Sequence, residues 1–398
     1  MLFSVPSLLF VTAIAGAAAW QGYGLPVLFA STLGVLILIV RGWSKASLSR
    51  IDFKRRLEAT RAFPDETIRC FCTLDNRKPL PLIWVDVLDR IPEAVMPEPG
   101  ELPDGVEKTA SGLSLSTALL WYQAATWTHA LNCRRRGLYE IGPAELTSGD
   151  LFGLLPRSRR ATAGENLIVY PRIFELDRFG LPTRSPLGEI RSGNPLHSDP
   201  LLFRGLRDYA PEIPLRHIHW KATARTGVFQ AKTFDPSSSL KAVIALDASA
   251  YAADDGIVNG DEFELAISTA ASVAWHLARS GVAVGIAANT RLAGGGATIS
   301  IEPKSGLEHL AFMLESLAKI TVPSRDFGPF LREAESLFAF GTSVIVVTGG
   351  LQDSARVRLA RLRRQGHPLM ALVVGDSAPD EPVLPWRRVG DPMTKATR

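Results

Sequence analysis

The stretch Lys241-Ala-Val-Ile-Ala-Leu-Asp247 decides the fold class of the carboxyl-terminal half of this chain. An apolar run ends there in an acid, which is typical of a central strand buried on both faces of a parallel sheet. A helical pattern follows at Glu262–Arg279 and ends before Gly281, a suitable helix cap. A second apolar run, Val282–Ala288, predicts the next buried strand.

The same alternation continues toward the end of the chain. We expect helices at Leu307–Ile320 and Asp353–Arg364, and strands at Ser343–Thr348 and Leu369–Val374. This order predicts an α/β fold, a doubly wound parallel sheet with helices on both faces. Sites in such sheets lie at the carboxyl ends of strands, near the topological switch point, and Asp247 stands at such an end.

The pattern nearer the amino terminus is different, with short runs of alternating polar and apolar residues. Thr67–Leu74 and Leu82–Leu88 alternate as half-buried strands should, and the series continues at Leu119–Ala130 and Arg136–Ile141. Short strands at this spacing predict a small antiparallel β-sandwich. The acids in this segment have no partner that the sequence identifies; they are Asp86, Asp89 and Asp150.

Composition limits the classes of partner. The chain has 398 residues and a net charge of +4, which is too small to indicate nucleic acid binding. Its three cysteines lack the spacing of a disulfide framework, so we expect free thiols in a reducing compartment. Cys70 and Cys72 point the same way on an alternating stretch, but no further Cys or His follows at the spacing of a zinc site.

The first forty residues predict a membrane anchor. Leu2–Val40 carries no charged side chain and is too long for one span, because about 20 apolar residues cross a bilayer. It breaks at Gln21-Gly22-Tyr23-Gly24, so we expect two helices, roughly Phe3–Trp20 and Leu25–Val40. A signal peptide is the alternative, because Ala17-Ala18-Ala19 resembles a cleavage site. The first residues lack the Lys or Arg of such a peptide, and a second span follows at once.

Basic residues beyond the second span set its expected orientation. Seven of them follow Val40, against the two acids Asp52 and Glu58: Arg41, Lys45, Arg50, Lys54, Arg55, Arg56 and Arg61. The positive-inside bias places this flank in the cytoplasm. We therefore expect a two-span protein of the inner (plasma) membrane whose soluble part is cytoplasmic.

The most distinctive stretch lies between the two halves. It contains Phe203-Arg-Gly-Leu-Arg-Asp-Tyr209 and Pro214-Leu-Arg-His-Ile-His-Trp-Lys-Ala-Thr-Ala-Arg-Thr-Gly227. This pair resembles the central motif of the bacterial family called domain of unknown function 58. Upstream, Arg136-Gly-Leu-Tyr-Glu-Ile-Gly-Pro143 and Asp150-Leu-Phe-Gly-Leu154 look like a second motif of that family.

The resemblance extends over nearly the whole chain, because the paired spans and Leu246-Asp-Ala-Ser249 also match the family's layout. One departure is Glu212-Ile213, where such proteins usually have Gly-Asp. The resemblance implies a relative of von Willebrand factor type A domains that accompanies a MoxR-type AAA+ ATPase. It implies a partner-binding role and identifies no reaction.

The expected domains follow from these patterns. They are a transmembrane hairpin at 1–41, a β-sandwich-like segment at 51–180, the family motif at 181–239 and the type A-like α/β domain at 240–390.

Metal binding at Asp247 is one hypothesis. A type A domain binds a divalent ion through Asp-x-Ser-x-Ser, a Thr and a second Asp, and such hard oxygen ligands suit magnesium. Asp247 and Ser249 match, whereas Tyr251 and Gly349 replace the second Ser and the second Asp. We expect a degenerate site that holds magnesium poorly, and hence no cofactor. In the other interpretation Asp247 caps the following loop by accepting backbone N–H bonds.

The family motif supplies a second candidate, a dense set of basic and aromatic residues: Arg207, Tyr209, Arg216, Trp220, Lys221 and Arg225. One interpretation, which we favour, is a structural network that ties the sandwich to the parallel sheet. The other is a surface for an anionic partner, because Arg recognises carboxylates bidentately. His217 and His219 are expected to alternate along a strand, as histidines hydrogen-bonded to neighbours or as a metal pair.

Catalytic motifs do not occur in the sequence. It has no Gly-x-Ser-x-Gly elbow, no Walker A loop and no His-Glu-x-x-His. We therefore predict a membrane-anchored cytoplasmic binding or scaffold protein, not an enzyme, that partners a MoxR-type AAA+ ATPase and no nucleic acid. The alternatives are a metal-dependent ligand-binding or hydrolytic protein centred on Asp247, and a purely structural membrane protein.

Overall fold

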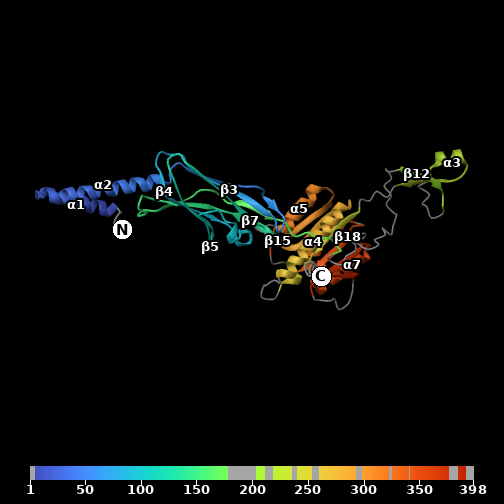
Figure 1. Ribbon diagram of the computed structural model, residues 1–398. Coiled ribbons are helices and arrows are strands. Elements are labelled where there is room, and N and C mark those ends of the chain that lie inside the picture. Colours follow the sequence, from blue (N-terminus) through green and yellow to red (C-terminus); the bar gives the residue numbers. More distant parts are fainter. Residues whose placement is uncertain are drawn as a thin grey trace. The chain divides into compact units, whose positions relative to one another are not determined.

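The computed structural model (Figure 1) describes residues 5–177, 203–210, 218–234, 240–252, 260–292, 298–321, 325–339, 341–375 and 384–390. The chain forms two compact units, Met1–Tyr170 and Pro171–Arg398, each with its own strands. It is a mixed α/β protein, as the sequence predicts.

Two apolar helices begin the first unit, α1 (Val5–Trp20) and α2 (Gly24–Ser47). They lie side by side, joined by a turn in which Gly22 has a φ of +75°, a conformation that glycine adopts without strain (Figure 1). With 24 residues α2 is about 36 Å long, enough to cross a hydrocarbon core of about 30 Å. Within the described residues α2 is the one helix long and apolar enough for a span. The second span, through α1, stays a prediction.

Three sheets follow α2 in the first unit. One contains three antiparallel strands in the order β1 (Ile51–Leu57), β3 (Thr67–Asn76) and β7 (Ala124–Asn132). The second has the order β10 (Arg157–Arg160), β9 (Ala144–Ser148), β4 (Leu82–Arg90), β6 (Gly112–Leu119) and β5 (Val106–Thr109). The third has the order β2 (Arg61–Ala62), β11 (Glu165–Val169) and β8 (Gly137–Ile141). Two short 3-10 helices, Glu93–Val95 and Pro99–Glu101, follow β4.

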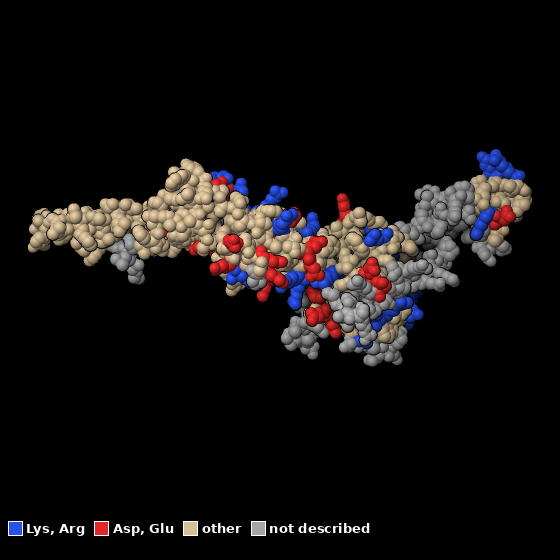
Figure 2. All heavy atoms as spheres, in the orientation of Figure 1, with Lys and Arg blue, Asp and Glu red and all other residues tan. Residues whose placement is uncertain are grey.

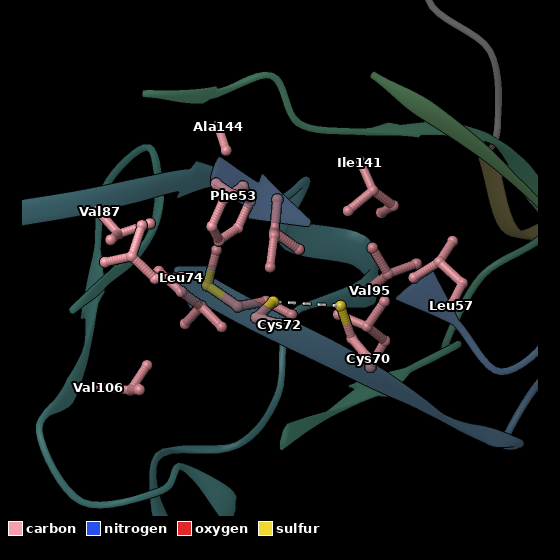
Figure 3. Packing of buried hydrophobic residues seen from close by; sticks show 14 of the residues in the cluster. Phe53, Leu57, Cys70, Cys72, Leu74, Val87, Val95, Val106, Ile141 and Ala144 are labelled. Carbon is pink, nitrogen blue, oxygen red and sulfur yellow. Dashed lines mark hydrogen bonds between the residues drawn. The ribbon is translucent and has the colours of Figure 1, made fainter. Parts of the chain in front are cut away.

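One apolar core serves all three sheets. Alternate residues of β3 face it, because successive side chains of a strand point to opposite faces. Cys72 of β3 packs there with Phe53, Val87, Ile141 and Ala144 from other strands (Figure 3). The core thus draws on residues far apart in the sequence.

The predicted strand at Leu119–Ala130 is wrong in its first part. β6 ends at Leu119, and β7 begins only at Ala124. Polar contacts hold the intervening turn: Gln123 Oε1 accepts from Leu120 N at 2.8 Å, and Asn76 Nδ2 donates to Leu120 O at 2.8 Å. The predicted strands at Thr67–Leu74 and Leu82–Leu88 are confirmed.

A buried ion pair links two sheets of this unit. Arg55 Nη1 lies 2.5 Å from Asp89 Oδ1, and the two side chains are 0% and 6% exposed. Arg55 Nη2 also donates to Ile141 O at 2.6 Å. Burial raises the pKa of the Asp89 carboxyl to about 6, and the charge of Arg55 opposes this rise. Asp89 therefore has a partner that the sequence does not reveal.

Polar contacts fix the end of α2 to the strands. Lys78, which precedes β4 and is 4% exposed, donates its Nζ to the carbonyl oxygens of Ser47 and Ser49. Burial lowers the pKa of the Lys78 ammonium to about 8. Ser44 Oγ donates to Leu155 O, between β9 and β10, at 2.6 Å. The helix end is therefore held by two different loops.

The second unit is built on a seven-stranded sheet. Its main order is β16 (Thr298–Lys304), β15 (Ala283–Leu292), β14 (Lys241–Leu246), β18 (Ser343–Thr348), β19 (Leu369–Val374) and β20 (Trp386–Val389). The short strand β17 (Ile320–Thr321) pairs with β15. Neighbouring pairs are parallel from β15 to β20, whereas β16 is antiparallel to β15.

Helices contact both faces of this sheet. Phe327 and Phe330 of α6 (Phe327–Glu333), with residues of α7 (Asp353–Arg364), share a core with Val243 and Ala245 of β14. Because neighbouring residues of β14 point the opposite way, Ile244 faces the side of α4 (Gly260–Arg279). The remaining elements are α5 (Leu307–Ala318) and the 3-10 helices at Ser249–Tyr251 and Ala334–Leu337.

The family motif forms a small hairpin with a helix. β12 (Phe203–Asp208) pairs with β13 (Gln230–Phe234), and α3 (Trp220–Thr226) lies between them in the sequence. The prediction that His219 lies on a strand is wrong. His219 is the N-cap of α3, and its Nδ1 accepts from Ala222 N at 3.0 Å. His217 falls outside the described residues.

The buried ion pair yields a stability prediction. Asp89→Asn keeps the shape of the side chain but removes the buried carboxylate from Arg55, which then has only the partly exposed Glu165 at 3.9 Å. We therefore expect a loss of about 3 kcal/mol in the free energy of unfolding. Urea unfolding followed by circular dichroism measures this loss. Glu58→Gln, which breaks the exposed pair with Arg69, is the control and should change stability little. An Asp89→Asn variant as stable as the control would contradict the prediction.

Candidate functional site

Parallel register brings three polar residues together at the carboxyl edge of the second sheet. Leu246 of β14 pairs with Ala288 of β15 and with Val347 of β18. The next residue along each strand is therefore Asp247, Asn289 or Thr348, and all three are buried. This edge is where the sequence predicts a site.

The Asp247 carboxylate accepts hydrogen bonds from three side chains. Ser249 donates to Asp247 Oδ1 from its Oγ at 2.6 Å and from its backbone N at 3.1 Å. Asn289 Nδ2 donates to the same oxygen at 3.3 Å, and Thr348 Oγ1 to Oδ2 at 3.1 Å. The bond from Ser249 N is the loop cap expected for Asp247. The hydroxyl groups of Ser249 and Thr348 add further bonds, so Asp247 belongs to a larger network.

Asn289 is the residue that sequence reasoning missed. Its Nδ2 also lies 3.2 Å from Ser249 Oγ and 2.7 Å from Arg325 O, and its Oδ1 accepts from Ala248 N at 2.7 Å. Asn289 thus ties the loop after β14 to the next strand. A polar residue directly after a buried parallel strand is the signal that identifies Asp247. Asn289 carries the same signal, since it follows the apolar run Val282–Ala288.

Burial shapes the electrostatics of this edge. Asp247 is 1% exposed, and its desolvation raises the pKa of the carboxyl above its ordinary value, while the bonds from Ser249, Thr348 and Asn289 oppose this rise. Tyr251, also buried, has a phenolic oxygen that finds no hydrogen-bond partner within the described part of the chain. Burial, together with the nearby Asp247 and Glu262, raises the pKa of this phenol.

Tyr251 and Gly349 fit one another. A Cβ added at Gly349 would lie 3.0 Å from Tyr251 Cε1, so the tyrosine ring occupies the space that a larger residue 349 would need. These are the two positions at which we expect, from the sequence, the metal site to lack a hydroxyl and a carboxylate. The oxygen atoms still present as possible metal ligands are the Asp247 carboxylate and the hydroxyls of Ser249 and Thr348. Both hydroxyls already donate hydrogen bonds to Asp247.

The second candidate set lies on the hairpin of the family motif. Arg207 is on β12, Tyr209 follows it, and α3 carries Trp220, Lys221 and Arg225. Arg216 falls outside the described residues. The four charged or indole side chains Arg207, Trp220, Lys221 and Arg225 are exposed.

Aromatic contacts organise this hairpin. Phe229 lies edge-on to Tyr209, with ring centroids 6.1 Å apart, and edge-on to Trp220 at 6.4 Å. Trp220 is nevertheless 66% exposed, and Val228 and Phe229 are each 54% exposed. The structure therefore presents an apolar patch with basic residues on the same small element, which we call the α3 patch: Arg207, Trp220, Lys221, Arg225, Val228 and Phe229.

A third surface lies on two loops of the first unit near the end of α2. The exposed apolar residues of these loops are Leu120, Trp121, Tyr122, Leu151, Phe152 and Leu154. The first loop contacts the Lys78 turn through Tyr122 N and Lys78 O at 3.3 Å, and the second contacts α2 through Ser44 and Leu155. Figure 2 shows one face without Lys, Arg, Asp or Glu that runs from the helices over the adjacent end of the sheets.

These features lie in a chain whose second half carries a family signature. Residues 205–397 match the family model described as "Protein of unknown function DUF58". The DUF58 match begins within β12 and covers α3, β13 and the whole seven-stranded sheet. It agrees with the resemblance carried by the arginine–tryptophan motif.

A relative and several solved structures show similarity as well. A protein of Bacillus subtilis (strain 168) described as "Uncharacterized protein YeaD" is 22% identical over 276 residues, covering 68% of this chain but 63% of that protein. The CARDB domain of the PF1109 protein from Pyrococcus furiosus is 9% identical, with a TM-score of 0.21, and covers 30% of this chain and 86% of that domain. A cohesin module from Clostridium perfringens is 8% identical, with a TM-score of 0.21, over 30% of this chain and 96% of the module. Scores this low carry no conclusion on fold or function.

The Asp247 site yields a prediction about magnesium. Millimolar Mg²⁺ should leave the melting temperature of the native protein unchanged, because Tyr251 fills the space of the missing ligand. The double variant Tyr251→Ser/Gly349→Asp supplies a hydroxyl and a carboxylate, so Mg²⁺ should stabilise it, by about 2.7 kcal/mol at 100 times the Kd. Differential scanning fluorimetry measures both.

The single variant Gly349→Asp is the control, and it should melt at a lower temperature than the native protein because its side chain meets the Tyr251 ring. A magnesium-dependent rise in the native protein that Asp247→Ala abolishes would contradict the prediction.

Proposed function

We propose that this chain is a membrane-anchored cytoplasmic binding or scaffold protein, and that its partner is a MoxR-type AAA+ ATPase. The observation that carries the proposal is the α3 patch, whose exposure favours the partner-surface interpretation of the motif over the structural network that the sequence favoured. Its exposed Trp220 and Phe229 beside Arg207, Lys221 and Arg225 have the composition of a binding hot spot, in which Trp and Arg are enriched. Basic residues around an apolar centre favour an acidic partner surface.

The arrangement of the second unit supports a type A-like scaffold. Numbering β14, β15, β16, β18, β19 and β20 from one to six, the sheet has the order 3-2-1-4-5-6 of doubly wound folds. Asp247 and Thr348 stand at the carboxyl edge, where type A domains place their ion. Because Tyr251 and Gly349 stand where such a site would need a hydroxyl and a carboxylate, we propose that partner recognition uses side chains of the α3 patch and not a bound ion.

The anchor is proposed to consist of α1 and α2 together, with the soluble part in the cytoplasm. Arg41 and Lys45 near the end of α2 support this orientation by the positive-inside bias. The two apolar loops beside that helix end support it further, since Trp and Tyr favour the membrane interface. We propose that Trp121, Tyr122 and Phe152 enter the headgroup region of the same bilayer.

The partner prediction is tested by co-purification. Full-length protein in detergent should retain the MoxR-type ATPase of the same cell in the presence of a non-hydrolysable ATP analogue. Trp220→Ala should weaken this binding about 30-fold, because truncating a hot-spot residue costs about 2 kcal/mol or more. Phe312→Ala, which removes an exposed aromatic side chain from α5, is the matched control and should leave binding unchanged. Recovery of no ATPase, or equal losses in both variants, would count against the proposal.

The membrane-contact prediction uses single reactive cysteines. The three native cysteines are buried, so a cysteine introduced by Trp121→Cys or Phe152→Cys can be labelled selectively with an environment-sensitive fluorophore. In lipid vesicles both labels should shift to the blue and be quenched by brominated lipids.

A label at Phe71→Cys, an exposed outward position on β3, is the control and should report water. Quenching at 121 and 152 no greater than at 71 would overturn the loop contact, while loss of the protein in a carbonate wash would overturn the anchor itself.

A further inference from the structure

Three potential metal ligands meet inside the first unit. Cys70 and Cys72 lie on the same face of β3, and Cys70 pairs in register with His129 of β7. One ligand atom from each residue lies within 4.8 Å of the other two. His129 is not apparent from the sequence as a third ligand, because spacing along the chain does not show which residue stands opposite on the neighbouring strand.

The distance between the two sulfurs suits a shared ion. Cys70 Sγ and Cys72 Sγ are 3.9 Å apart (Figure 3). An ion about 2.3 Å from each sulfur would subtend an S–metal–S angle of about 116°, between tetrahedral and trigonal values. A disulfide is less favourable here, because residues two apart on a strand have Cα atoms about 6.6–6.8 Å apart, at the upper limit of disulfide geometry.

His129 is placed as a ligand would be. It is 2% exposed, and neither of its ring nitrogens has a hydrogen-bond partner of acceptable geometry among the residues that the structure describes. Buried imidazole nitrogens are normally paired, because an unpaired polar atom loses its hydration without compensation. A metal bond from one nitrogen would remove this cost.

The charges around the cluster also suit a cation. Arg55 and Asp89 lie nearby and neutralise one another. Two thiols that bind Zn²⁺ release two protons, so the net charge of this dry core stays unchanged.

We propose that Cys70, Cys72 and His129 bind one thiophilic metal ion with a filled d shell, Zn²⁺ or Cu⁺, within the core of the first unit. Thiolate and imidazole donors match both ions. Charge balance favours Zn²⁺, whereas the number of three protein ligands suits Cu⁺. The site is structural in this proposal: it joins β3 to β7 and carries no reaction.

Metal titration of the full-length protein in detergent tests the proposal. Anaerobic equilibrium dialysis against Zn²⁺ in one arm and Cu⁺ in the other, each with a competing chelator, should show one equivalent bound. The arm with the tighter binding identifies the ion. Cys70→Ser, Cys72→Ser and His129→Gln should each weaken binding by more than the 10- to 100-fold that loss of a second-shell partner typically causes. Cys133→Ser removes the third buried cysteine and should bind as the native protein does.

A second readout uses the native chain, in case a variant does not fold. The thiols are alkylated during brief exposure to urea, and mass spectrometry measures the rate at each cysteine. Bound metal should slow alkylation of Cys70 and Cys72 and leave that of Cys133 unchanged. Failure of the reduced native protein to bind either ion would overturn the proposal. Equal binding by the His129→Gln variant would overturn it as well, and so would equal protection of all three cysteines.

Discussion

In-register pairing of neighbouring strands determines which side chains meet in both units. In the second unit the parallel register of β14 with β15 and β18 places Asp247 beside Asn289 and Thr348. In the first unit the antiparallel register of β3 and β7 places Cys70 opposite His129. Backbone hydrogen bonds fix these registers, and a slip of one residue would turn each of these side chains to the other face of its sheet.

The strength of each local pattern explains how far the sequence predicts this fold. The strands at Ser343–Thr348 and Leu369–Val374 have the expected bounds, because burial on both faces leaves a continuous apolar run. The edge strands Thr298–Lys304 and Trp386–Val389 were missed, since an edge strand buries fewer residues and shows no such run. The helix Phe327–Glu333 was missed as well, because seven residues give too little periodicity.

The candidate site was predictable only where it follows a strand. Asp247 stands at the end of an apolar run and was expected at a sheet edge. Its partner Asn289, and the fit of Tyr251 against Gly349, depend on contacts across strands that a single sequence does not display. The same holds for Asp89, whose partner Arg55 is on a strand of another sheet.

Two exposed surfaces differ in chemistry, and the difference fits two kinds of partner in the proposed function. The α3 patch combines aromatic rings with Arg and Lys, as a surface for an acidic protein would. The loops at Leu120–Tyr122 and Leu151–Leu154 expose mainly apolar side chains beside α2, as a surface for lipid would.

Lys78 makes the junction between α2 and the strands of the first unit rigid. Its ammonium group holds the carbonyl oxygens of Ser47 and Ser49, while Ser44 binds the carbonyl of Leu155 from a different loop. Two attachment points at one helix end restrict bending and rotation more than a single peptide linkage does. The end of α2 is therefore attached rigidly to the strands of the first unit. In the proposed membrane-anchored protein, a force applied to the strands of the first unit would therefore be transmitted to α2.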